Sequence, residues 1–327
     1  ATTALVATTG MAAADVSFSG LARFGILYVE DGDTVAPSVT PATAGPDGIW
    51  GTADDEPAVL NDASSGPETR IESRFQLDIQ GTATADNGLE FTAALRGRSE
   101  DNPDGGADPM AWNAAQFGIA YEGLSVQVGN IAGVFDSQDG MYDQSLGLSG
   151  LGFHNHVGNS AVNGSWGFDT YSSKGAGRNG VRVAYGMGDF SAIASYSDLD
   201  DLERTALGAS YSFNDWSVHL GWQDSSDDTE DKISLIVQGD LGPASVTFKA
   251  ADNDGEQKYV IGGDFDAGAA TTISAFFATD EEVGGVGGDT YGVGFVHDLG
   301  GGTSIRGGVV DQWNDKLTAD LGLQFNF

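Results

Sequence analysis

Cysteine is absent from the chain of 327 residues, which excludes a disulfide framework, a thiolate metal site and a cysteine nucleophile. Basic residues are few, at 14 against 48 acidic ones. The resulting net charge of -34 excludes a nucleic-acid partner, because phosphate binding needs a basic surface. Proline is scarce, at 8 residues, which argues against a disordered Pro-rich chain, and no apolar run reaches the roughly 18 residues of a membrane-spanning helix.

The clearest pattern that is present is the alternation of residues at the end of the chain. Apolar side chains occupy every second position from Leu317 to Phe327, and polar residues or glycine fill the positions from Lys316 to Asn326 between them. A period of two places the two sets on opposite faces of a β-strand. We expect this strand to close a barrel whose outer face meets lipid and whose inner face meets water.

The same alternation recurs along the chain, most clearly in segments 16–29, 68–84 and 89–99. Short turns are expected at Asn87, Gly123, Gly188, Asp215, Gly242, Gly268 and Gly301. Longer connections are expected at about 30–67, 100–111, 131–176, 198–203, 224–231, 251–257, 280–289 and 311–315. The fold class is therefore all-β: a sixteen-stranded antiparallel transmembrane β-barrel, with short periplasmic turns at one end and long outer loops at the other.

The positions of the basic residues test this interpretation. All except Lys174 and Arg178 fall at inward positions of the expected strands, while the outward files carry almost no charge. A charge on the lipid face at the bilayer midplane costs about 2–4 kcal/mol, whereas a soluble sheet would bury its inner face and wet its outer one. The inward set is Arg23, Arg70, Arg74, Arg96, Arg98, Arg182, Arg204, Lys232, Lys249, Lys258, Arg306 and Lys316.

One long connection, 131–176, is the candidate constriction of the pore. A lumen of sixteen strands is too wide for its own side chains to fill, and a connection of this length is usually functional. We expect this third loop to fold inward, with Asp136, Asp139 and Asp143 facing basic side chains across the lumen. The alternative is that these aspartates are solvated loop charges. The expected basic wall comprises Arg23, Arg70, Arg74, Arg96 and Arg98, and the opposed charges would set a transverse field.

The first long connection contains the acidic segment GPDGIWGTADDEP. Asp47, Asp54, Asp55 and Glu56, separated by glycines, supply the hard oxygen ligands that suit Ca²⁺. Their spacing does not match an EF-hand, so a solvated acidic loop is the alternative. Acidic loops that face an anionic outer leaflet would in general recruit divalent cations.

Histidine and serine give no sign of catalysis. His154 and His156 lie two residues apart with no third His or Cys nearby, so we do not expect a metal site there. His219 is expected to face the lumen without a serine partner of the kind that a hydrolase needs. No Gly-rich phosphate loop and no H-E-x-x-H motif occur, and we therefore do not expect an enzyme.

The first fourteen residues, small and apolar and ending in Ala12-Ala13-Ala14, are typical of the tail of a secretory signal. We expect residues 1–14 to be the rest of a cleaved signal peptide and residues 15–327 to form a single barrel domain. The alternative is a flexible N-terminal arm. Export of a chain without cysteine suits a bacterial envelope.

From Asp15 onward the chain resembles a general diffusion porin of the alphaproteobacterial type. The resemblance is strongest in SFSGLARFGILY, in RIESRFQLDIQGTATADNGLEFTAALRG and from residue 291 to the end, where Phe327 is similar to the family's outer-membrane assembly signal. It implies a homotrimer of sixteen-stranded barrels with the third loop inside and Ca²⁺ among the acidic loops. By the same resemblance Arg23, Arg70, Arg74 and Arg96 match the basic wall, and residues 136–143 match the acidic eyelet segment. The first connection departs from the family by its greater length.

The expected function is passive diffusion of small hydrophilic solutes and ions through a water-filled channel in the outer membrane of a Gram-negative bacterium, among lipid and lipopolysaccharide. Size and the transverse field would act as the filter. We expect a weak cation preference that fades as salt rises, because salt screens the field of the acidic loops. Two alternatives remain: a structural or adhesive barrel with cation-binding loops, and a channel specific for a sugar or an organic acid.

Overall fold

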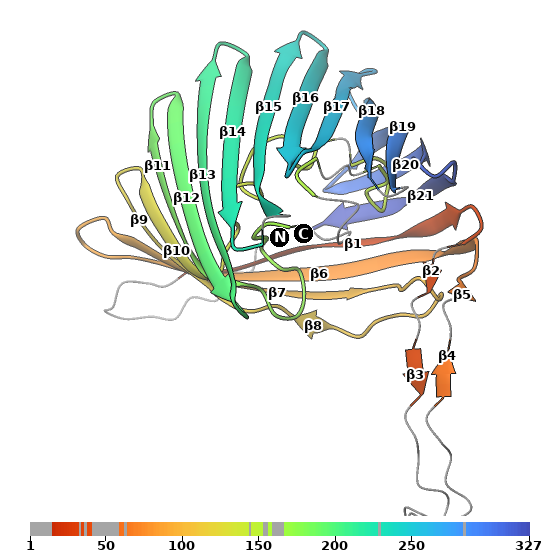
Figure 1. The fold of residues 1–327 in the computed structure, drawn as a ribbon, viewed down its shortest axis with the longest axis horizontal. Helices are drawn as coiled ribbons and strands as arrows, with labels where there is room; N and C mark the ends of the chain where they lie inside the picture. Colours follow the sequence, from red (N-terminus) through yellow and green to blue (C-terminus); the bar gives the residue numbers. More distant parts are fainter. Residues whose placement is uncertain are drawn as a thin grey trace, which may run out of the picture.

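The structure is a computed structural model that describes ten stretches of the chain. They are residues 15–32, 34–35, 38–40, 59–61, 64–143, 145–152, 156–158, 167–227, 230–283 and 286–327. Within these stretches no helix is both long enough and apolar enough to cross a bilayer. The architecture is a closed antiparallel β-barrel (Figure 1).

The barrel wall is one continuous sheet of 17 hydrogen-bonded strands. They are β1 (Asp15–Val29), β6 (Thr69–Thr84), β7 (Glu90–Glu100), β8 (Ala111–Trp112), β9 (Gln116–Tyr121), β10 (Leu124–Asn130), β11 (Asn179–Met187), β12 (Phe190–Leu199), β13 (Leu202–Phe213), β14 (Trp216–Ser225), β15 (Lys232–Leu241), β16 (Ala244–Asn253), β17 (Glu256–Asp266), β18 (Thr271–Val283), β19 (Val286–Gly300), β20 (Thr303–Asp311) and β21 (Leu317–Asn326). Both β8 and β9 pair with β7, so they are two parts of one interrupted strand. The wall therefore has the sixteen strands that the sequence predicts.

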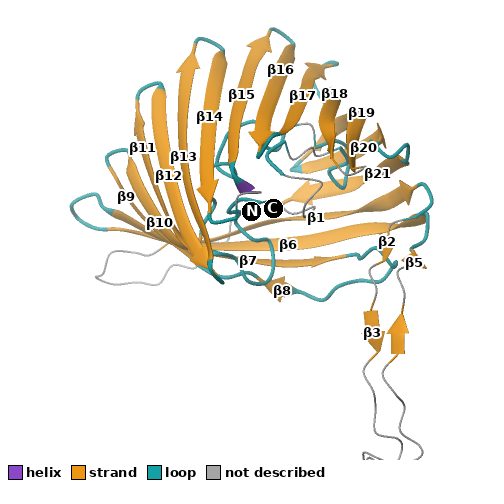
Figure 2. Cartoon of the chain, in the orientation of Figure 1, coloured by secondary structure: helices purple, strands orange, loops and turns teal. Residues whose placement is uncertain are grey.

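The first and last strands close the barrel. Arg23 of β1 lies opposite Gln324 of β21 on one side and opposite Arg74 of β6 on the other. Since every wall strand has two neighbours, the sheet has no free edge to pair with another chain. Four short strands, β2 (Thr34–Val35), β3 (Ser38–Thr40), β4 (Val59–Asn61) and β5 (Ser64–Ser65), lie in the first long connection. There β2 pairs with β5 and β3 pairs with β4, and β3 and β4 project away from the barrel wall (Figures 1 and 2).

The two faces of the wall have opposite polarity. On β1, Phe18 and Ile26 are 63% and 58% exposed, and Ile71 on β6 is 72% exposed, although all three are large and apolar. On the inner face of the same strands Arg23 and Glu72 are buried. A broad exposed apolar surface marks contact with a membrane or a partner, and the alternation of the sequence predicts this arrangement.

The seven short turns lie where the sequence predicts them, but two of the connections expected to be long are tight. Leu199 pairs with Leu202 across Asp200 and Asp201, whose φ angles are 54° and 67°. Asn253 pairs with Glu256 across Asp254 and Gly255 in the same way. Positive φ at both central positions is the requirement of a type I′ hairpin turn, which aspartate and glycine tolerate. Acidic residues thus form turns at positions where the sequence interpretation placed loops.

Candidate functional site

The connection between β10 and β11 lies inside the barrel, as Figure 1 shows in green within the ring of strands. We call residues 131–178 the inner loop; its described parts are 131–143, 145–152, 156–158 and 167–178. Apolar residues of these parts are buried at 0–9% exposure, and several form two clusters with wall residues such as Ile236 and Val310. The buried loop side chains are Ile131, Val134, Phe135, Met141, Leu146, Leu148, Leu151, Val157 and Phe168. Apolar burial therefore holds the loop against the inner wall.

Glycines on the inner wall make room for these side chains. A Cβ atom at Gly208 of β13 would lie 2.7 Å from a methyl group of Val134. A Cβ atom at Gly221 of β14 would collide with the ring of Phe135. Contacts this short do not occur in real structures, so both positions need glycine for close approach of the loop.

Polar side chains of the wall bind the backbone of the loop. The carboxylate of Asp320 accepts hydrogen bonds from the backbone N–H groups of Leu148 at 2.9 Å and Ser149 at 2.7 Å. The ammonium group of Lys249, which is 0% exposed, donates to the carbonyl oxygens of Met141 and Asp143 at 2.9 Å each. Lys232 donates in the same way to Val157 at 2.9 Å. The sequence places these residues on the inner face but does not show that they bind the loop.

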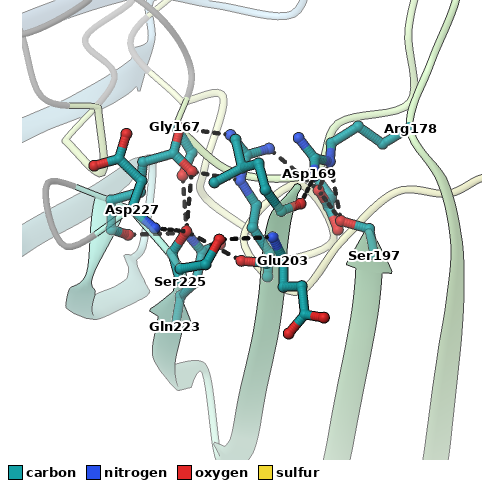
Figure 3. A network of polar contacts seen from close by, with 12 residues as sticks. Gly167, Asp169, Arg178, Ser197, Glu203, Gln223, Ser225 and Asp227 are labelled. Atoms are coloured by element: carbon teal, nitrogen blue, oxygen red, sulfur yellow. Dashed lines mark hydrogen bonds and ion pairs between the residues drawn. The ribbon is translucent and has the colours of Figure 1, made fainter. Parts of the chain in front are cut away.

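The last part of the inner loop is held by a network of ion pairs and hydrogen bonds with β12, β13, β14 and the connection after β14 (Figure 3). Arg204 donates to both oxygens of Glu230 at 2.6 Å and lies 3.2 Å from Asp169 of the loop. Arg178 lies 3.4 Å from the same oxygen of Asp169. The amide of Gln223 donates to the carbonyl of Gly167 at 2.9 Å. Because both ends of each charge pair are bonded, the network can position the loop without leaving a bare buried charge.

Strand register gathers the five arginines expected to form a basic wall. They lie on β1, β6 and β7, which are neighbours in the sheet. Arg23 lies directly opposite Arg74, and Arg96 and Arg98 lie opposite Asp78 and Gln76. Sequence alone thus predicts which arginines share one side of the lumen.

Each of these arginines has a carboxylate partner, which the sequence interpretation missed. The pairs are Arg23 with Glu72, Arg70 with Asp101 at 3.2 Å, Arg74 with Glu100 at 2.8 Å, Arg96 with Asp78 at 2.5 Å and Arg98 with Glu100 at 3.9 Å. The sequence does contain a sign of this pairing, since Glu72 and Asp78 have the same inward parity as Arg70 and Arg74. The wall is therefore less positive than a count of its arginines suggests.

The three aspartates of the inner loop do not lie together. Asp136 accepts a hydrogen bond from the backbone N–H of Tyr171 at 2.9 Å and another from the hydroxyl of Tyr142. The ring of Tyr171 lies 5.1 Å from the guanidinium of Arg96, so Asp136 is beside the basic wall. Asp143 instead accepts a hydrogen bond from Thr247 of β16 at 2.7 Å, and Asp139 is exposed. The basic residue beside Asp143 is thus Lys249 of β16, which donates to its carbonyl oxygen, and not an arginine of β1, β6 or β7.

The candidate calcium ligands of the first long connection are not part of the described structure. Asp47, Asp54, Asp55, Glu56 and His154 lie outside the described residues. Among the described residues no group of three or more His, Cys, Asp or Glu side chains could hold a metal ion.

The expectation that His219 has no serine partner is wrong. Its Nδ1 lies 2.8 Å from the hydroxyl of Ser210 and its Nε2 lies 3.1 Å from that of Ser217. Cross-strand register produces the first contact, because Ser210 pairs with His219. Since serines occupy both ring nitrogens, neither nitrogen is left for the carboxylate that orients the base of a hydrolase triad.

Comparisons with known proteins agree with the barrel. A family model described as Gram-negative porin matches residues 1–317. A curated porin of Fuscovulum blasticum is 26% identical over 343 residues, covering 96% of this chain and 100% of that protein. A porin of Rhodobacter capsulatus is 28% identical over 312 residues, covering 80% and 95%. The solved structure of a triple mutant of Rhodopseudomonas blastica porin is similar with a TM-score of 0.72 at 25% identity, covering 95% of this chain and 100% of that one.

Proposed function

The chain belongs to the Gram-negative porin family, and from this membership we propose that its inner loop is the filter of a passive outer-membrane channel. The family and the similar porins indicate diffusion of small solutes through the barrel across the outer membrane. The fold supplies what such diffusion requires: a closed wall, an apolar outer face and a polar inner face. In this proposal the chain binds no cofactor for transport and catalyses no reaction.

The observation that carries the proposal is the side of the lumen on which the inner loop lies. Its apolar residues pack on the wall from β11 through β21 to β1, where Leu148 lies against Gly25, while its described contacts with β6 and β7 include the Arg96–Tyr171 stacking and the ion pair of Lys174 with Glu100. We infer that the pore passes between the arginines of β6 and β7 and the loop segment that contains Asp136 and Tyr142. A solute in this gap would meet charges of both signs, which favours dipolar solutes over apolar ones.

The charged surface on the far side of the ring supports a transverse field. A hollow at the short-turn ends of β13 to β17 is lined by Asp143, Asp215, Asp240 and Asp264. No basic side chain lines it among the described residues. In the proposed channel this surface extends the acidic side of the field beyond the inner loop.

Three further parts of the proposal concern the setting of the barrel. We propose that three copies assemble as a homotrimer among lipid and lipopolysaccharide. We propose that the chain is exported with a signal peptide that is then removed.

We also propose that the acidic first connection binds Ca²⁺. Removal of calcium with a chelator should then lower the melting temperature of the refolded protein. An unchanged melting temperature would contradict calcium binding.

The experiment that tests the channel is single-channel recording of the refolded protein in a planar bilayer. A homotrimeric water-filled channel should open in groups of three equal steps, with a conductance roughly proportional to salt concentration. Single steps that are not grouped in threes would contradict the trimer alone. Insertion without any conductance would contradict the channel and favour a structural or adhesive barrel.

A further inference from the structure

A polar cavity of about 470 Å³ lies in the lumen toward the short-turn ends of β6 to β11. We call it the lumen pocket. Strand residues that include Gln80, Arg96, Gln127 and Arg182 line it, and Tyr171 of the inner loop lies at its boundary. This volume falls within the range of pockets that hold small molecules.

Two polar groups of the pocket lack a partner. The Nε of Arg182 and the Oε1 of Gln127 are buried, and neither has a hydrogen-bond partner among the described residues. Strand register places Gln127 of β10 directly opposite Arg182 of β11. Most buried polar groups in proteins are hydrogen-bonded, so an unpaired donor beside an unpaired acceptor calls for an occupant.

The chemistry of this pair selects the occupant. Arg182 can only donate and the Gln127 oxygen can only accept, whereas a hydroxyl group does both and could satisfy both atoms. The charges at the pocket are balanced only with the help of the inner loop: Asp78 is bonded to Arg96 at 2.5 Å, and Asp136, outside the lining, interacts electrostatically with Arg182. Gln80 and Gln116 add further amide groups, and Tyr171 adds an aromatic ring.

We propose that the lumen pocket is a transit site for a neutral polyhydroxylated solute of sugar-like chemistry. Arg182 donates to one of its hydroxyl oxygens through Nε, and Gln127 accepts from a hydroxyl hydrogen. The inference rests on the proposed channel function, since the solute reaches the site through the lumen. A pocket of this kind makes the current through the channel depend on sugar concentration in a saturable way.

The test is the half-blocking concentration of a neutral oligosaccharide, maltotriose, for the ion current in a planar bilayer. In the unaltered protein the current should fall to a plateau as the sugar is added. Gln127→Leu removes the acceptor, and Arg182→Lys keeps the charge but removes Nε. Each should raise the half-blocking concentration about fivefold, the effect of one hydrogen bond, measured relative to the salt current of the same variant.

The matched control is Gln238→Leu on β15. Gln238 also has a buried unpaired Oε1, but it lines the acidic hollow and lies opposite Thr247, not an arginine. This variant should keep the half-blocking concentration of the unaltered protein. An equal rise in Gln238→Leu and Gln127→Leu would overturn the assignment of the site.

Other outcomes separate the inference from the channel proposal. A conducting protein whose current falls only in proportion to solution viscosity would refute the transit site and leave the channel intact. If glucuronate blocks at lower concentration than a neutral sugar of its size, the pocket takes anions and the neutral assignment fails. If the protein does not conduct, saturation-transfer NMR with maltotriose tests the site instead. A saturation-transfer signal that Gln127→Leu abolishes supports the transit site. The absence of a signal in the unaltered protein overturns it.

Discussion

At the scale of single residues, the position of the inner loop depends on wall side chains that hold its backbone. Asp320 is the clearest, because one carboxylate oxygen accepts from two backbone N–H groups and from the hydroxyl of Ser149. A carboxylate that accepts several donors forms stronger bonds than a neutral acceptor does. Loss of its charge should therefore loosen the loop without removing an apolar contact.

We expect Asp320→Asn to weaken this attachment by about 2 kcal/mol, the value of a few charge-assisted hydrogen bonds over neutral ones. The looser loop should add low-frequency noise to the open-channel current in single-channel recordings. Asp240→Asn is the control, since it removes the same charge from the inner wall without contacting the loop in any described bond. Equal noise in both variants would show that charge, and not attachment, governs the signal.

The contact between the inner loop and the connection that follows β7 offers a second prediction at this scale. Lys174 of the inner loop donates to Glu100 at 2.9 Å and to Asp108 at 3.0 Å. Its hydrogen bond to Glu100, followed by the one to Asp108, raises the pKa of Lys174, and the bond from Lys174 lowers the pKa of Asp108. A carboxyl group whose pKa is lowered in the folded protein stabilises the fold at pH values above the ordinary aspartate pKa. This stabilisation is lost as the pH falls through the lowered pKa. A lysine whose pKa is raised in the folded protein stabilises the fold at pH values below the ordinary lysine pKa. This stabilisation is lost as the pH rises through the raised pKa.

This attachment should therefore persist from about pH 4 to about pH 10. Hydrogen exchange of residues 101–110 and 167–178, corrected for intrinsic rates, should be equally protected at pH 5, 7 and 9. Lys174→Met should lower the protection at all three values, whereas Lys316→Met should not. The effect should be small, because the pair is partly exposed. A loss of protection between pH 7 and pH 5 would contradict the pairing.

At the scale of elements, the inner loop and the wall are matched in shape. Strands β13 and β14 place glycines under Val134 and Phe135, so the loop lies against the wall and not in the middle of the lumen. Glycine in a strand interior has a conformational cost of roughly 0.5–1 kcal/mol relative to alanine. Its use here indicates that close approach of the loop outweighs that cost.

We expect Gly208→Val to cost about 1–3 kcal/mol through overpacking and to push the loop toward the pore axis. Single-channel conductance should fall as a result. Gly186→Val on β11 is the matched control, because a Cβ atom at Gly186 meets nothing within 4 Å. If Gly208→Val conducts as well as the control does, the loop is not held by this contact.

At the scale of the whole molecule, charge is distributed unequally between the wall and the connections. The net charge is -34, while the arginines of β1, β6 and β7 are each paired with a carboxylate. The unbalanced negative charge then acts mainly over distance, on ions that approach the mouth. A field of this kind depends on ionic strength, because the Debye length falls from about 30 Å at 0.01 M to about 3 Å at 1 M salt.

We therefore expect a weak cation preference at low salt that fades toward 1 M. Reversal potentials across a salt gradient, measured at several mean concentrations, give this preference directly. A strong anion preference at low salt would show that the arginine wall, and not the acidic surface, sets the selectivity. A preference independent of salt would place the deciding charges inside the constriction, beyond the reach of screening.

The sequence by itself determined the class of the fold, its strand number and the polarity of its two faces. A period of two is a local property of each strand, so residues such as Phe24 and Arg23 report their faces without any knowledge of their neighbours. The same parity predicted that the arginines of β1, β6 and β7 share one side of the lumen. It also predicted that the third long connection is the exceptional one.

The tertiary structure alone decided which inward charges are bonded and to what. Lys249 binds loop carbonyls, Asp143 turns to Thr247 and His219 lies between two serines, all through contacts that join distant segments. Parity gives the face of a side chain but not its partner, because partners depend on strand register and on how a long loop packs. The position of the filter therefore depends on tertiary packing, whereas the barrel that contains it follows from the alternation of apolar and polar residues along each strand.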